Sequence, residues 1–418
     1  MNQKTNLILL IIIGLLLSAL ITKNGRILLL TIPIISYLGA GFLTSSTKVN
    51  LRISRKVENY RVEENEHNSM LISITNLGLN IQSLDWQERI FPGIQLISGD
   101  IHQMIMLPEE QSIEFQYDFH AKRGRYDWRE VHLIISDPFQ LFTKEVKQPS
   151  NAVSIVFPKK VILPKLKIKP RYTLQSPGLN LSNKPGSGID FWGIREFSTG
   201  DSLGHIHWRL SAKYPNQFFI KQFEQENMAD FGILIDASKS NEPDDEKYAL
   251  VDYCVEAGAA ISRSLLRSGN RVSMFILGKN RTRVYPGIGK HQLHRILDTL
   301  AGCEPGDVSL PDLIKFLPLR FFSSRTTIIV ISPLIQNDHS LISRLRAEGY
   351  QVLLISPNPL PSFMVQNTPS ESNLHLRAMR IEREIMLWKI RRMGVNVIDW
   401  PIDKPLVNLF QAMRVVRS

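Results

Sequence analysis

The residue types best suited to chemistry gather between positions 188 and 212 of the 418-residue sequence. Arg195, Glu196, Asp201, His205 and His207 all lie in this stretch. A histidine oriented by a carboxylate is a common general base, so His207 is a candidate base with Asp201 or Glu196 as its partner. On a strand, His205 and His207 would face the same side and could hold a metal ion together.

The same stretch has two other interpretations. In the first, its arginine, carboxylates and histidine form a hydrogen-bonded network that ties the chain to its neighbours, with Trp192 and Trp208 as packing anchors. In the second, it is a binding surface. No nucleophile and no third metal ligand stands at a spacing that favours catalysis. We therefore expect a structural brace, with Arg195 and Glu196 buried as a pair.

A second candidate site follows the apolar run 231–235. Asp236, Ser238 and Ser240 come directly after this run. One carboxylate and two hydroxyls spaced by two residues can direct three oxygen atoms at one point, which suits a hard cation such as Mg²⁺. The alternative is that the two serines cap the turn and the helix that follow.

The elements that position this second site alternate between strands and helices. Apolar runs predict strands at 231–235, 272–277, 326–332, 350–355 and 395–399. Helices are expected between them, over 246–268, 291–301, 341–348 and 373–393, with a basic helix at the end of the chain. Gly269 and Gly349 should end two of these helices. The alternation predicts an α/β doubly wound parallel sheet over 230–418, with ligands beyond the carboxyl ends of its strands.

The preceding part of the chain follows a different pattern. Short alternating strands without a convincing helix predict an antiparallel β-sandwich over 47–158. Residues 159–229 begin with a stretch rich in Pro, Lys, Gly, Ser and Asn, which indicates a linker leading into the polar stretch described above.

Two apolar runs without charges open the sequence, at 7–22 and 27–44. Each is about 25 Å long as a helix, slightly short for a hydrocarbon core of about 30 Å, and flanking lysines or local thinning can absorb the difference. A cleaved signal peptide and a buried hairpin of a soluble protein are the alternatives. Because the second run follows after a short turn, we expect a transmembrane helical hairpin over 1–46.

Basic residues indicate which side of the membrane holds the rest of the chain. The connecting loop has Lys23 and Arg26, whereas the outer flanks have the amino terminus and more basic side chains: Lys4, Lys48, Arg52, Arg55 and Lys56. The positive-inside rule therefore predicts a plasma-membrane protein, in the inner membrane where a cell has two, with most of the chain in the cytoplasm.

Composition excludes several classes of protein. The hydrophobic fraction of 43% and the charged fraction of 21% are those of a folded chain. Two cysteines, Cys254 and Cys303, are too few for a disulfide framework or a cysteine-rich zinc site. No phosphate-binding P-loop motif is present, which disfavours ATPase activity. The net charge of +11 permits a membrane-surface or nucleic-acid binder, but no nucleic-acid-binding motif supports it, so we expect no nucleic acid.

Residues 188–226 resemble a known family in the order of their glycine, polar and aromatic positions, and we call them the signature segment. These positions are Gly193, Arg195, Glu196, Gly200, Asp201, His207, Trp208, Phe223, Glu224 and Glu226. The segment is similar to the signature of the bacterial domain of unknown function fifty-eight. The family plan extends the resemblance over nearly the whole chain: a membrane hairpin, a β-sandwich with Arg-Gly-Arg-Tyr and Asp-Pro-Phe turns, the signature and a von Willebrand factor A-like domain.

The resemblance implies a function, because proteins of this family accompany MoxR-type AAA+ ATPases. The expected role is a membrane-anchored, non-catalytic interaction module that acts with such an ATPase on an unknown client protein, in its assembly or maturation. A hydrolase that uses Asp201 and His207 is the alternative.

The resemblance also makes Asp236, Ser238 and Ser240 the first loop of a metal-ion-dependent adhesion site. Such a site needs a threonine on a second loop and an aspartate after the fourth strand. Here the second loop reads Gly-Asp-Val-Ser-Leu over 306–310, and the strand ends in Ser332 and Pro333. The site is therefore incomplete, and we expect only weak Mg²⁺ binding, with Asp307 or Ser309 as substitutes.

Overall fold

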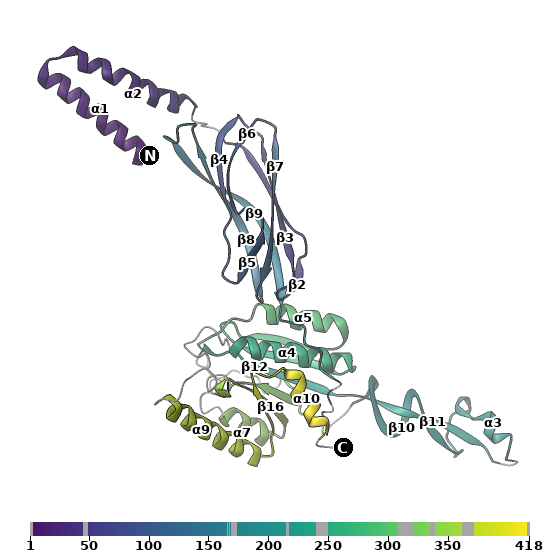
Figure 1. Cartoon of the computed structure of the whole chain (residues 1–418). Coiled ribbons are helices and arrows are strands. Elements are labelled where there is room, and N and C mark those ends of the chain that lie inside the picture. Colours follow the sequence, from purple (N-terminus) through teal and green to yellow (C-terminus); the bar gives the residue numbers. More distant parts are fainter. Residues whose placement is uncertain are drawn as a thin grey trace. The chain divides into compact units, whose positions relative to one another are not determined.

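The computed structural model describes residues 3–44, 49–164, 166, 168, 174–214, 217–239, 250–307, 321–334, 339–361 and 372–415. The chain divides into two compact units, Met1–Phe157 and Pro158–Ser418. Figure 1 labels their elements in chain order.

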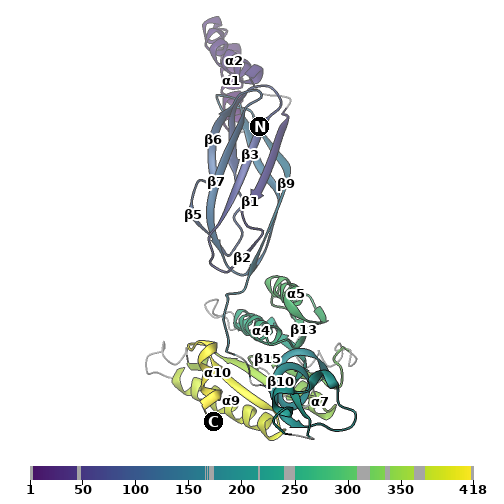
Figure 2. The same ribbon diagram turned by 90° about the vertical axis from the view of Figure 1, so that its right-hand side faces the viewer.

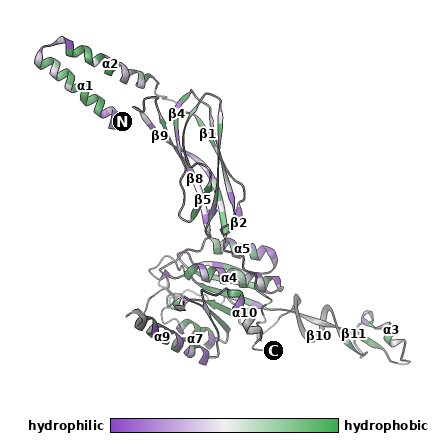
Figure 3. Ribbon diagram, in the orientation of Figure 1, coloured by the Kyte–Doolittle hydropathy of each residue, from purple (hydrophilic) through white to green (hydrophobic). Residues whose placement is uncertain are grey.

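Two apolar helices begin the first unit, as the sequence predicts. They are α1 (Gln3–Thr22) and α2 (Gly25–Thr44), joined at Lys23 and Asn24. The turn is held by Asn24, whose carbonyl accepts from the Ile27 amide at 3.2 Å. Both helices are long and apolar enough to cross a membrane (Figure 3), and most of their side chains are exposed. Such a pair of helices suggests membrane anchoring.

The rest of the first unit is a β-sandwich of two sheets (Figure 2). The first sheet has the order β1 (Leu51–Val57), β3 (Asn68–Asn76), β7 (Ser112–Ala121) and β5 (Ile94–Ser98). The second has the order β2 (Arg61–Glu63), β9 (Thr143–Phe157), β8 (Gly124–Ser136), β4 (Ile81–Gln87) and β6 (His102–Leu107). Neighbouring strands are antiparallel, except that β2 runs parallel to β9. The predicted antiparallel sandwich is confirmed apart from that pair.

The chain enters and leaves the sandwich at opposite ends. Leu51 pairs with Asn76, so the start of β1 lies beside the β3–β4 turn, and the β6–β7 and β8–β9 turns close the same end. We call this the entry end. Val156 pairs with Gly124, so β9 finishes at the other end, where Phe157 leaves the sandwich.

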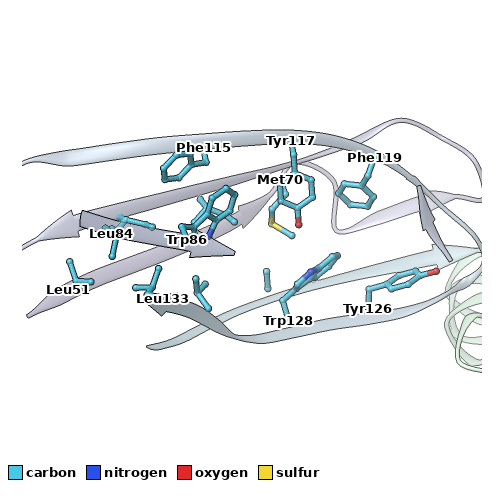
Figure 4. Packing of buried hydrophobic residues seen from close by; sticks show 14 of the residues in the cluster. Leu51, Met70, Leu84, Trp86, Phe115, Tyr117, Phe119, Tyr126, Trp128 and Leu133 are labelled. Carbon is cyan, nitrogen blue, oxygen red and sulfur yellow. The ribbon is translucent and has the colours of Figure 1, made fainter. Parts of the chain in front are cut away.

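Alternating side chains from the two sheets meet in the sandwich core. Trp86 stacks on Phe115 with ring centroids 4.5 Å apart (Figure 4). The Trp128 ring contacts the rings of Phe91 and Phe119 at centroid distances of 5.5 and 6.1 Å. The burial of β3 follows the strict alternation expected of a strand with one face in the core.

One buried ion pair joins the two sheets. The Arg55 guanidinium of β1 donates to both carboxylate oxygens of Glu88, at 2.8 and 2.9 Å, and to the Ser150 carbonyl of β9 at 3.0 Å. Both charged side chains are fully enclosed, at 0% and 1% exposure. Burial raises the pKa of the Glu88 carboxyl, and the charge of Arg55 opposes that shift.

The second unit contains a two-stranded arm and an α/β domain. The arm consists of β10 (Leu174–Glu196) and β11 (Phe219–Met228), which pair antiparallel with several register shifts. Between them lie the 3₁₀ turn η1 (Leu203–His205) and the short helix α3 (Trp208–Ser211). Strands therefore occupy 174–196 and 219–228, within the region that composition indicates as a linker.

The α/β domain is built on a six-stranded sheet of order β14-β13-β12-β15-β16-β17. Its strands are β12 (Asp230–Asp236), β13 (Arg271–Leu277), β14 (Thr282–Gly287), β15 (Thr327–Ile331), β16 (Gln351–Asn358) and β17 (Asn396–Pro401). All pairs are parallel except β13 with β14, so the sheet is mixed and mostly parallel. The predicted doubly wound sheet is confirmed.

Helices cover both faces of this sheet (Figure 1). They are α4 (Leu250–Arg267), α5 (Gly289–Ala301), α7 (His339–Ala347), α9 (Ser372–Arg392) and α10 (Leu406–Val415). Side chains of α7 and α9 form one core cluster with Leu234, Val330 and Leu354 of the sheet. On the opposite face α4 comes so close to β12 that a Cβ atom on Gly258 would lie 2.5 Å from Ile235. Gly269 and Gly349 follow α4 and α7 with positive φ, as the sequence predicts.

Candidate functional site

The signature segment forms the outer part of the arm, where β10 turns back towards β11. The Arg195 guanidinium donates two hydrogen bonds to the Asp201 carboxylate, each of 2.6 Å. It also donates to the Glu196 carbonyl at 2.9 Å. The Ser198 amide donates to the same Asp201 carboxylate at 2.8 Å. Gly200, at a φ of +107°, allows the chain to reverse between these residues.

This arrangement differs from the pair expected from the sequence. Asp201, not Glu196, is the partner of Arg195, and the Glu196 side chain is exposed. The side chains of Arg195 and Asp201 are 41% and 18% exposed. The prediction that Arg195 and Glu196 are buried together is therefore wrong. The brace is local: it shapes the turn of the arm.

The same bonds fix the charges of the pair. The hydrogen bond from Arg195 lowers the pKa of the Asp201 carboxyl, and the bond from the Ser198 amide lowers it further. The bond to Asp201 also raises the pKa of Arg195. Asp201 is thus an anion at neutral pH whose two oxygens already accept from Arg195.

His207 begins α3 and does not sit on a strand. Its Nδ1 accepts from the Leu210 amide at 3.1 Å, which makes His207 the N-cap of that helix, and its own amide donates to the Phe219 carbonyl at 2.8 Å. His205 ends the 3₁₀ turn just before it. Asp201 bonds to Arg195 and His207 to Leu210, so the two members of the candidate acid–base pair belong to separate groups of hydrogen bonds.

The arm exposes large apolar and aromatic side chains around this polar scaffold. We call them the arm surface: Phe191, Trp192, Ile194, Leu203, Trp208, Tyr214 and Phe218. Trp208 is 64% exposed, and its ring meets the edge of Phe218 at a centroid distance of 6.5 Å. Ile206 and Ile220 of the arm are joined by a backbone bridge, and both are buried. The two tryptophans expected to be packing anchors are therefore surface residues.

The second candidate site lies at the carboxyl ends of β12 and β15, the switch point of the sheet. The Asp236 carboxylate accepts from the Ser238 hydroxyl at 2.6 Å through one oxygen and from the Ser332 hydroxyl at 2.7 Å through the other. All three side chains are buried. Ser240 and Ser309 lie outside the described residues. The structure thus brings Asp236 and Ser238 together, and Ser332 supplies a further hydroxyl from the next strand.

The second loop comes close to this cluster through a glycine. Gly306 forms a bridge with Ser238, and its carbonyl accepts from the Lys239 amide at 2.6 Å. A Cβ atom on Gly306 would lie 2.2 Å from the Gly278 backbone, so only glycine fits there. Asp307 follows directly and is exposed. Asp307 is therefore the residue directly after the glycine that contacts Ser238.

An arginine that sequence reasoning missed neighbours the same edge. Arg383 of α9 donates to the Pro333 carbonyl, the Ser356 hydroxyl and Asp399, each at 2.7 Å. Ser356 and Asp399 pair near the carboxyl ends of β16 and β17, so their position close to strand ends was the available signal. The guanidinium binds the residue next to Ser332 and places a positive charge near the Asp236 edge.

These oxygens are a poor fit to a tight divalent site. Mg²⁺ prefers six oxygen ligands with several negative charges, whereas this cluster offers one carboxylate and two neutral hydroxyls. Within the ranges that the structure describes, no three His, Cys, Asp or Glu side chains come together as a metal-binding group. The residues present suit only a weak cation site.

A separate cavity of about 430 Å³ lies in the same unit. Its walls include Lys159, Lys160 and Lys404 together with the aromatic rings of Tyr253 and Trp400. Glu256 and Asp403 also line it. The lining of this cavity therefore carries both positive and negative charges.

The fold and these sites define a chain with two N-terminal apolar helices, a β-sandwich and a mixed, mostly parallel α/β sheet. Residues 193–358 match the family described as "Protein of unknown function DUF58". The resemblance seen in the signature segment is confirmed over these residues. No curated protein matches the chain.

Several solved structures are similar to parts of the chain at low identity. The CARDB domain of a Pyrococcus furiosus protein is 12% identical, with a TM-score of 0.19, over 27% of this chain and 97% of that one. The cupredoxin domain of amoB from Nitrosocaldus yellowstonii is 9% identical, with a TM-score of 0.21, over 31% and 99%. Proximal thread matrix protein 1 from the mussel byssus is 15% identical, with a TM-score of 0.27, over 45% and 44%. These similarities carry no inference about function.

Proposed function

We propose that this chain is a membrane-anchored, non-catalytic interaction module that acts with a MoxR-type AAA+ ATPase in the assembly or maturation of another protein. The family resemblance is the reason for proposing this ATPase as the partner. The helices α1 and α2 anchor the chain in the plasma membrane, and the basic flanks favour a cytoplasmic location for the sandwich and the α/β domain.

The observation that carries the proposal is the arm surface. Monomeric soluble proteins rarely leave large apolar side chains exposed together without a binding role. Tryptophan, tyrosine and arginine are also the residues that most often dominate binding energy at interfaces. The arm exposes Trp192, Trp208 and Tyr214, and all three lie in the signature segment.

The polar residues of the signature support binding over catalysis. The charges of Arg195 and Asp201 neutralise each other, and one ring nitrogen of His207 accepts the hydrogen bond that caps α3. A catalytic carboxylate has to orient its histidine, and here Asp201 orients the turn instead. These residues therefore give the arm a defined shape on which its aromatic side chains are displayed.

The test compares two exposed tryptophans of the second unit. The full chain and a MoxR-type ATPase are co-expressed, extracted in mild detergent, and their affinity is measured by surface plasmon resonance. Trp208→Ala should weaken the complex roughly thirtyfold, because a central interface tryptophan is worth about 2 kcal/mol. Trp388→Ala is the matched control, since Trp388 is 54% exposed on α9 and lies outside the arm.

Two results would count against this function. Equal affinity of the parent and the Trp208→Ala variant for the ATPase would remove the arm surface from the interaction. A hydrolytic activity that disappears in Asp201→Asn and His207→Ala variants with an unchanged fold would favour the enzyme instead.

A further inference from the structure

The entry end of the sandwich exposes a second apolar surface, distinct from the arm surface. Leu77 and Leu79 lie on the β3–β4 turn, Met104 and Met106 on β6, and Phe139 on the β8–β9 turn. Leu79 is 60% and Met106 72% exposed. We call these five residues the entry-end patch.

The turns that carry this patch satisfy their own polar groups. The Asn76 side-chain amide donates to the carbonyls of Leu79, Leu107 and Pro108 at 2.9 to 3.1 Å. In the β8–β9 turn, the Asp137 carboxylate accepts from the amides of Phe139 and Phe142. Moving a turn from water into a membrane interface costs less free energy when its backbone groups are already hydrogen-bonded.

The covalent chain keeps the patch close to the end of α2. Seven peptide steps separate Thr44 from Leu51, which span about 25 Å at most. The Asn50 carbonyl then accepts from the Leu77 amide at 2.8 Å, so the β3–β4 turn lies directly beside the point of entry. Wherever α2 leaves a membrane, the entry-end patch stays within reach of its surface.

Side-chain contacts bring the β8–β9 turn against both apolar helices. Lys4 of α1 donates to the Gln140 side chain at 3.3 Å. The rings of Tyr37 and Phe139 lie 4.8 Å apart, and those of Phe42 and Phe142 lie 5.8 Å apart. Aromatic side chains grouped with a lysine at helix ends are typical of the membrane–water interface.

We infer that the entry-end patch lies in the interface of the bilayer that holds α1 and α2, in contact with lipid. The inference rests on the proposed membrane anchoring. Because exposed apolar side chains make up the patch, their burial drives the contact. Vesicles of neutral phosphatidylcholine should therefore support it.

The test uses the full chain reconstituted in phosphatidylcholine vesicles, with one nitroxide label at a time. The labels are attached through Leu79→Cys and Met106→Cys in the patch, through Leu29→Cys on α2, and through Ile97→Cys on β5. Ile97 is the matched control, because it is 47% exposed and lies away from the entry end. Cys254 and Cys303 are buried, and the labelled parent measures their background.

Collision rates with oxygen, which concentrates in lipid, and with a water-soluble nickel chelate report where each label lies. The oxygen rate should exceed the nickel rate at positions 79 and 106, as it does at 29, and the order should reverse at 97. Labels at 79 and 106 that behave like 97 would overturn the inference and leave the anchoring intact. Low rates with both reagents would mean that protein covers the patch, which also overturns it. A label at 29 that reacts mainly with nickel would overturn the anchoring itself and this inference with it.

Discussion

Replacing Glu88 with alanine should destabilise the sandwich by about 3–5 kcal/mol, the cost of leaving one member of a buried ion pair without its partner. Arg55 has 0% side-chain exposure in the parent. Without Glu88, the acceptor left to it among the described residues is the Ser150 carbonyl. The Nε atom of Arg55 is already buried without a hydrogen-bond partner among the described residues. The charge therefore has few ways to recover the lost interaction without opening the core.

Amide hydrogen exchange of the full chain in detergent measures this loss, because core strands exchange through opening of the whole domain. Peptides from β1 and β8 should exchange roughly a hundredfold to several-thousandfold faster in Glu88→Ala than in the parent. Glu114→Ala is the matched control: Glu114 is exposed on β7, and its removal should change stability by about 0.5 kcal/mol or less.

A double variant separates the charge from the packing. Arg55→Met with Glu88→Leu removes both charges and should recover most of the stability, since apolar replacements of buried pairs are often neutral or stabilising. If Glu88→Ala exchanges like the parent, the pair does not carry the stability that its burial implies. If the double variant is as unstable as the single one, shape and not charge is the cause.

Three further outcomes are expected. The pKa of Asp201 is lower in the folded chain than in the unfolded chain, so the stability that its bonds give the arm is fully present above the unfolded pKa and is lost as the pH falls through the folded pKa. Hydrogen-exchange protection of the Ser198 amide, corrected for its intrinsic exchange rate, should therefore fall in that pH range in the parent. The Asp201→Asn variant should show no such fall. His207→Ala should destabilise α3 by about 1 kcal/mol whereas His207→Asn retains a cap, and equal exchange of the Leu210 amide in both would contradict the capping role. Calorimetric titration of Mg²⁺ should give an affinity in about the millimolar range that Asp236→Ala abolishes, and micromolar affinity would show that residues outside this cluster complete the site.

Local sequence patterns were sufficient to predict features that depend on one helix or strand alone. Alternation predicts β3, and glycine after an amphipathic run predicts the ends of α4 and α7, because each depends on neighbours a few residues away. The apolar run before Asp236 likewise places that carboxylate at the end of a buried strand. These features require no knowledge of which other segments pack nearby.

Side-chain partners that are brought together by a turn or by a distant part of the chain could not be predicted from local sequence patterns. Adjacency suggests Glu196 for Arg195, but a turn at Gly200 returns Asp201 instead. Arg383 reaches the sheet edge from a helix far along the chain, so nothing in its local pattern marks it. The composition of β10 is typical of a linker, and its pairing with β11 overrides that propensity.

The separate entry and exit of the sandwich have a mechanical consequence. A pull on Pro158 directed away from Leu51 loads β9 along its length, and β1 in the opposite sense. Their ladder hydrogen bonds run across the strands, so this load shears them together instead of opening them in succession. The parallel pairing of Arg61, Val62 and Glu63 with Ile155, Val156 and Phe157 stands at the last residues before the exit and resists first. A pull on the second unit would therefore reach α1 and α2 through strands that are loaded in shear.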